Sequence, residues 1–172
     1  QVSFAVITIF ANQRGLTDAA AVGIVEKIIS ILFLVPSSMM STISALVAQN
    51  IGAGKHDRAK LTLKYVLMIT VTYGLIMTII VQFVSVPLVG LFTNDGAVAV
   101  SGAGYLRSYA SDCIFAGIHF CLSGYFYAYG LSVISFIHNS ISIVCARIPL
   151  SYYASVHFKD TLFPMGCAAP AG

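Results

Sequence analysis

The amino-acid sequence predicts an all-α fold, a polytopic transmembrane helical bundle with about four complete and two partial spans. Only 9% of the 172 residues are charged, 58% are hydrophobic, and the mean hydropathy is +0.91. A soluble domain carries about 25% charged residues, so this chain cannot cover a water-facing surface. A membrane-spanning helix needs roughly 20 largely apolar residues. Several apolar runs of the chain reach that length, and turn-forming or charged residues separate them.

Both ends of the chain lie inside apolar runs. The first run, at 2–11, is too short to span a bilayer, and the last begins at Leu162. The opening run follows no basic segment and precedes no small-residue cleavage site, so it does not resemble a signal peptide. We therefore expect residues 1–172 to be a single fragment of a longer protein.

The first complete span is expected from about Ala19 to Asn50. It carries no charge between Ile28 and Gly54, a stretch of about 40 Å as helix. This exceeds the hydrocarbon thickness, so a tilt or a bend is expected. Pro36 is the expected bend, because proline removes one backbone donor and crowds the preceding turn. Gly52 and Gly54 should end the helix, since glycine readily takes the left-handed cap conformation.

The most charged part of the chain follows this span. Four cations occur within ten residues, namely Lys55, Arg58, Lys60 and Lys64. Short loops rich in lysine and arginine face the cytoplasm. Loop 55–64 is therefore predicted to be cytoplasmic in a multi-pass plasma-membrane protein, and it sets the direction of every other span.

The remaining spans alternate in direction. The expected segments are an outward span at about 61–92, an outer turn at 93–96, an inward span at about 109–129, an inner turn at 128–132, an outward span at about 133–156, and an outer-face segment at 157–160. A small-residue stretch at 97–104 should lead into the inward span.

Charged side chains at lipid depth cost about 2.5–3.5 kcal/mol each on insertion scales, so each needs a structural or functional reason. Glu26, beside Lys27, lies near the outer end of the first span. It either sits at the interface or faces a central cavity and binds a proton or cation. Asp112 lies about two turns into the inward span, where it could load protons. Its alternative role is an ion pair with Arg107 in the outer headgroup zone.

Other polar residues at lipid depth also have two interpretations. Arg147 lies far from both ends of its span, so it needs either a buried partner or a water-filled cavity. Pro149 should free the carbonyl of Cys145 and soften that helix. His119 and His138 are either packing residues or members of a proton relay.

Three tyrosines, Tyr125, Tyr127 and Tyr129, crowd the inner end of the inward span. Tyrosines at a span end commonly form an interfacial belt. They could also line a pocket for planar cations.

Several other function classes lack their sequence signals. The cysteines form no C-x-x-C pair, which argues against a zinc or redox site. Gly52–Lys55 lacks the spacing and the Ser/Thr of a phosphate-binding loop. No catalytic triad, H-E-x-x-H or paired-carboxylate motif is present, so neither an enzyme nor a cofactor is expected. The net charge of +3 is scattered, which argues against a nucleic-acid partner.

Two stretches resemble the multidrug and toxic compound extrusion (MATE) family. Residues 44–54, with Gln49 and Asn50 before Gly-Ala-Gly, are similar to a family signature at the inner end of an inward helix. Tyr105-Leu106-Arg107 and Arg147-Ile148-Pro149-Leu150 form the second similarity. The resemblance covers nearly the whole chain. It implies the C-terminal six-helix lobe, from late helix 7 to early helix 12, with the missing N-terminal lobe as its partner.

The chain also departs from the family pattern. Many members carry Gly-x-Leu-Arg-Gly late in helix 10, whereas residues 124–128 keep the glycine and place Tyr127 where the arginine would be. Asp112 lies about a turn too early to match the helix 10 acid of some branches. The helix 1 aspartate of many members belongs to the other lobe. The family's ion site therefore cannot be transferred to this chain.

The resemblance implies alternating access in a lipid bilayer, with export of organic cations in exchange for Na⁺ or H⁺. One alternative is a flippase for lipid-linked precursors from the same broad superfamily. That function needs a larger and more cationic cavity than Arg147 alone suggests. A non-transporting membrane scaffold is the other alternative, and an intramembrane enzyme would need motifs that the sequence lacks.

Overall fold

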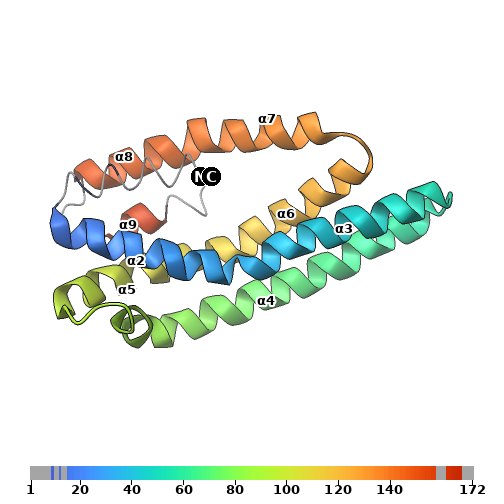
Figure 1. Cartoon of the computed structure of the whole chain (residues 1–172). Helices are drawn as coiled ribbons and strands as arrows, with labels where there is room; N and C mark the ends of the chain where they lie inside the picture. Colours follow the sequence, from blue (N-terminus) through green and yellow to red (C-terminus); the bar gives the residue numbers. More distant parts are fainter. Residues whose placement is uncertain (1–8, 10–11, 13–14, 158–161, 168–172) are drawn as a thin grey trace.

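The computed structural model describes residues 9, 12, 15–157 and 162–167, apart from the side chains at 146, 147, 155 and 165. The described elements are α2 (Leu16–Leu32), α3 (Leu34–Gly52), α4 (His56–Gly90), α5 (Gly96–Ala110), α6 (Asp112–Ala128), α7 (Ser132–Ser142), the π-helical turn η1 (Ile143–Arg147), α8 (Ile148–His157) and α9 (Phe163–Gly166). The described residues include no strand, which confirms the all-α class (Figure 1).

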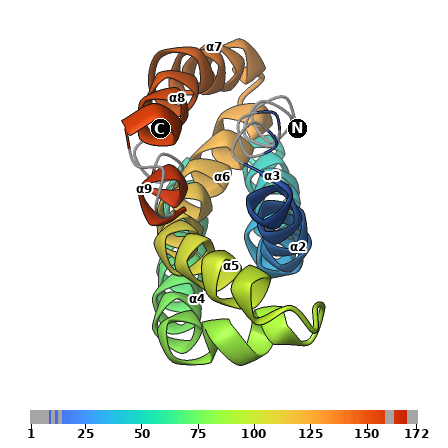
Figure 2. The ribbon, with the colours of Figure 1, turned by 90° about the vertical axis from the view of Figure 1, so that its left-hand side faces the viewer.

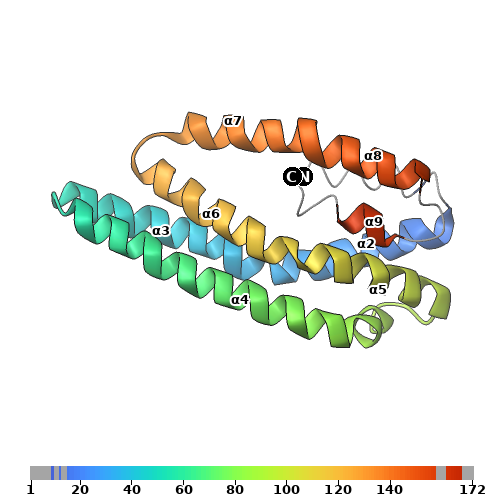
Figure 3. The ribbon, with the colours of Figure 1, turned by 180° about the vertical axis from the view of Figure 1, so that it is seen from behind.

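The helices form long limbs that run back and forth (Figures 1 and 3). The α2–α3 limb and α4 run in opposite directions. The α5–α6 limb packs on both of them, with α5 against α2 and α4, and α6 against α3 and α4. The α7–α8 limb lies beyond α6, away from α4, as the end-on view shows (Figure 2). The α3–α4 and α6–α7 turns share one end of the bundle, as the alternating topology predicts.

Three helical segments are long and apolar enough to cross a membrane, among the residues described: Leu16–Gly52, His56–Gly90 and Ser132–Ala154. The expected inward span at 109–129 differs from this pattern. Its helix begins at Gly96 and is interrupted at Ser111, so it forms two helices of 15 and 17 residues. The partial span at 2–11, residues 158–160 of the outer-face segment and much of the last run lie outside the described residues.

The small-residue stretch at 97–104 is a helix because its small side chains pack well. Asp95 starts α5, since its Oδ1 accepts a hydrogen bond of 2.8 Å from the backbone N–H of Ala97. Val98, Ala99 and Ala103 are then buried. This stretch has no strong apolar periodicity, and close packing against α2 and α4 stabilises it instead.

The predicted turns are confirmed by backbone geometry. Gly54 follows α3 with φ +70°, and the N–H of Lys55 donates to the carbonyl of Asn50 at 2.8 Å. Gly130 has φ +75° between α6 and α7. Both glycines adopt a conformation that other residues rarely take.

Two apolar cores lie along the bundle. One contains Val22 and Val25 of α2 with Leu106 of α5. The other contains Ile43 and Val47 of α3, packed with parts of α4 and α6. Outside these cores large apolar side chains remain uncovered: Phe83 of α4 is 80% exposed and Phe136 of α7 is 72% exposed. Lipid is the solvent that suits such a surface.

Glycines allow the closest helix contacts. A Cβ added at Gly124 of α6 would collide with the backbone carbonyl of Met40 and the side chain of Ile43 on α3. A Cβ at Gly74 of α4 would lie 3.0 Å from the Cα of Ile114. Small residues of this kind let membrane helices approach closely. Gly124 is also the glycine that the chain shares with the resembled family segment.

We predict that Gly124→Ala lowers the stability of the full-length protein by about 1–3 kcal/mol, because the added methyl overpacks the α3–α6 interface. Gly104→Ala is the matched control, since nothing lies within 4 Å of a Cβ at that helical position. Thermal unfolding of both variants in detergent measures the difference. Equal melting temperatures would contradict the close α3–α6 packing.

Candidate functional site

The first helix break leaves a backbone carbonyl free, and a side chain from another helix donates a hydrogen bond to it. Pro36 lacks the N–H that would bond to the carbonyl of Leu32, four residues earlier. The regular helix is interrupted between α2 and α3 at Phe33, three residues before Pro36. The hydroxyl of Tyr73, on α4, donates to the Leu32 carbonyl at 3.0 Å. The freed acceptor is therefore satisfied from a neighbouring helix.

The second break, between α5 and α6, is held in the same way. The N–H of Ile114 bonds to the carbonyl of Ser111 instead of that of Ala110. Thr78 on α4 donates to the Ala110 carbonyl at 3.0 Å, sharing its hydroxyl hydrogen with its own helix. The amide of Gln82 donates to the carbonyl of Arg107 at 3.1 Å.

These α4 residues form one feature, which we call the α4 polar face: Tyr73, Thr78, Gln82 and Ser85. Ser85 is buried and accepts a 2.6 Å hydrogen bond from Nε of Arg107. Sequence reasoning misses this face, because the span carries no charged residue between Tyr65 and Asn94 that would signal it. The spacing of Thr78, Gln82 and Ser85 by four and three residues was the available signal, since it places them on one side of a helix.

The two candidate acids occupy different elements. Asp112 is the first residue of α6 and is 2% exposed. Because α5 precedes it and α6 follows it, Asp112 lies near the middle of the 96–128 stretch. Glu26 is half-buried on α2 beside the buried Val25, whereas Lys27 is exposed.

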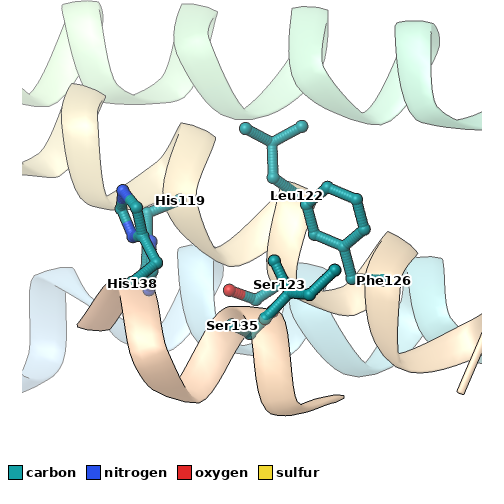
Figure 4. A pocket seen from close by; sticks show the side chains of 7 residues that line it. His119, Leu122, Ser123, Phe126, Ser135 and His138 are labelled. Carbon is teal, nitrogen blue, oxygen red and sulfur yellow. The ribbon is translucent and has the colours of Figure 1, made fainter. Parts of the chain in front are cut away.

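His119 and His138 are brought together by the fold. Their rings, on α6 and α7, stack with centroids 5.2 Å apart and planes inclined by 22° (Figure 4). They line a pocket of about 110 Å³ between the two helices. The pocket is otherwise lined by Leu122, Ser123, Phe126, Ile134 and Ser135. No described group of three or more His, Cys, Asp or Glu could hold a metal ion.

The tyrosines at the end of α6 divide into two sets. The hydroxyls of Tyr125 and Tyr129 lie 3.4 Å apart, and that of Tyr129 lies 3.5 Å from Nδ1 of His56. Tyr127 is not part of this contact and is 41% exposed. The contact ties the α3–α4 turn to the α6–α7 turn.

Arg147 lies in the π-helical turn η1, which the sequence signalled only through the nearby Pro149. In this turn the N–H of Ile148 reaches back to the carbonyl of Ile143. The part of the helix that Pro149 was expected to soften is therefore a π-helical turn, and such turns are frequent at functional sites. Pro149 is exposed, and the side chain of Arg147 lies outside the described residues.

The Gln49-to-Gly54 stretch builds the end of α3. The side-chain amide of Asn50 donates to the carbonyl of Leu46 at 2.8 Å, and the Gln49 carbonyl accepts from the N–H of Ala53. Gly52 closes the helix and Gly54 reverses the chain. Gln49 itself is exposed. In this conformation the stretch ends a helix and holds a turn.

Comparison with known proteins identifies the family of this chain. The family model MatE matches residues 1–153. The chain belongs to the MatE family. Both stretches that resemble the family lie within the matched residues, as do the two helix breaks and the histidine pair.

A curated relative gives a more specific comparison for this MatE chain. It is named "FAD transporter", from Shewanella oneidensis (strain MR-1), and is 28% identical over 138 residues. The match covers 79% of the chain and 30% of the relative, so the chain spans less than a third of that protein's length. No solved structure matches the chain significantly.

We predict that Tyr73→Phe destabilises the full-length protein by about 1–2 kcal/mol, because it leaves the Leu32 carbonyl without its donor in an apolar environment. Pro36→Ala supplies a backbone donor to the same carbonyl. In that background Tyr73→Phe should cost much less, and a double-mutant cycle of unfolding free energies measures the difference. Tyr65→Phe, at an exposed tyrosine of the same helix, is the control. Additive effects of the two changes would contradict the shared acceptor.

Proposed function

We propose that the full-length protein is a secondary active antiporter of the plasma membrane that exports organic cations, including drugs, in exchange for Na⁺ or H⁺. The MatE match over residues 1–153 is the observation that carries this proposal. In the proposed antiporter the chain supplies much of the C-terminal lobe, and the N-terminal lobe completes the transport path. Loop 55–64 faces the cytoplasm.

The geometry supports a transporter in a specific way. Discontinuous membrane helices are a recurrent feature of secondary transporters, in which one helical unit moves against another. Here three limbs are interrupted, at Phe33, at Ser111 and at η1. At the first two breaks, side chains of α4 donate hydrogen bonds to the released carbonyls. The α2–α3 limb, α4 and the α5–α6 limb can therefore move as one body. The third lies on the α7–α8 limb, whose large apolar side chains are mostly uncovered.

The relative named "FAD transporter" favours a second candidate, export of a flavin dinucleotide. FAD carries planar aromatic rings, like many organic cations, but it is an anion. An exporter of FAD would need positive charge in its path. Arg147 is a candidate for this role because it interrupts an otherwise uncharged limb.

An efflux assay on the full-length protein separates these candidates. Cells or proteoliposomes are loaded with ethidium or with FAD, and an inward Na⁺ or H⁺ gradient is imposed. The antiporter proposal predicts ethidium export that stops when the driving gradient is collapsed. Gradient-dependent export of FAD without ethidium would support the second candidate. Retention of both under every gradient would contradict the proposed transport.

A further inference from the structure

The pocket between α6 and α7 is apolar except at a few positions. Its polar groups are the two imidazoles and the hydroxyls of Ser123 and Ser135. Ser135 is 5% exposed, and its hydroxyl has no hydrogen-bond partner among the described residues. Ser151, on α8, also has a buried hydroxyl without a partner among the described residues, but Ser135 is the one of the two that lines this pocket, where its hydroxyl is available to another species.

The two histidines lie deep in their helices. His138 is six residues into α7, about 9 Å from its start, and His119 is nine residues before the end of α6, about 14 Å. His138 lies in the segment Ser132–Ala154, which is long and apolar enough to cross a membrane, and His119 stacks on it from α6. Imidazole is the side chain that changes charge near neutral pH. Two imidazolium rings stacked with their centroids 5.2 Å apart would repel each other, and this like-charge repulsion disfavours a second proton on the pair.

Few other titratable groups surround the pair. The α3 helix carries none, and His138 is the one acid or base of α7. On the α4 face toward this region, Tyr73 is engaged with the Leu32 carbonyl. On α6, Asp112 lies seven residues before His119, two helical turns along the same side. Arg147 follows on the α7–α8 limb. A proton on the pair would therefore add a positive charge to a pocket whose other lining residues are neutral.

We propose that His119 and His138 form a single-proton site, and that its protonation separates α6 from α7. The neutral rings stack and hold the two helices together. One proton, bound at a ring nitrogen, brings charge into the apolar pocket, and the protonated pair draws in water, for which the Ser135 hydroxyl is a ready partner. Loss of the same proton to the opposite side restores the stack. In the proposed antiporter, on which this last step rests, the pair is the site of the coupling H⁺.

Spin labels measure the separation directly. Phe115→Cys on α6 and Ile141→Cys on α7 replace exposed residues outside the pocket. They are introduced into the full-length protein after its native cysteines are replaced by serine. The label distance should lengthen between about pH 8 and about pH 5.5, the range of histidine titration. His119→Gln and His138→Gln should each abolish the change, and His157→Gln, at an exposed histidine near the end of α8, should retain it.

The outcomes separate this inference from the proposed function. The single-proton site is overturned if the label distance does not respond to pH, or if it responds in the His119→Gln and His138→Gln variants as it does with both histidines present. Either result overturns the site even if H⁺-driven efflux occurs. A response that depends on both histidines supports the site even if no substrate is exported. If the variants fail to fold, histidine NMR of the unsubstituted protein decides. One proton taken up by both rings together supports the site, and two independent titrations overturn it.

Discussion

The structure depends on one constraint, which is that no backbone carbonyl can remain without a donor inside a lipid bilayer. Each unsatisfied group there costs several kcal/mol. The chain nevertheless interrupts helices at Phe33 and Ser111. It can do so because the α4 polar face supplies side-chain donors to the carbonyls that the breaks release, at 3.0–3.1 Å. The α4 helix is thus the continuous element on which two broken limbs are aligned.

This arrangement explains how the packing is distributed. The limbs fastened to α4 also pack most closely, with Gly124 and Gly74 at their contacts and two apolar cores between them. The α7–α8 limb has no comparable attachment among the described residues, and its contacts with α6 centre on the histidine pocket. A firm body of three limbs and a more loosely joined fourth is a physical basis for the movement of helices that the proposed transport requires.

Much of the fold could be predicted from the sequence because the bilayer imposes simple rules. The scarcity of charge predicted the membrane class, Pro36 predicted the first break, and the glycines at 54 and 130 marked the turns. The second break could not be predicted, because neither proline nor glycine occurs at Ser111 and the donors that hold it lie 32 and 25 positions away from the carbonyls that they bind. The helix at 97–104 was missed because its stability comes from close packing of small residues, which leaves little apolar periodicity. For the site, sequence identified both histidines but could not show that they stack, since that contact depends on how α7 returns along α6.

Hydrogen–deuterium exchange at the second break tests most directly whether α4 secures the broken limbs. In the full-length protein, amides at 111–115 should exchange nearly as slowly as the adjoining turns of α5 and α6. Replacing both donors, Thr78→Val with Gln82→Leu, should raise exchange at 111–115 by about tenfold or more, because the carbonyls released by the break lose their partners. Amides at 30–37, held by Tyr73, should be unaffected. Unchanged exchange at 111–115 in the double variant would contradict the account.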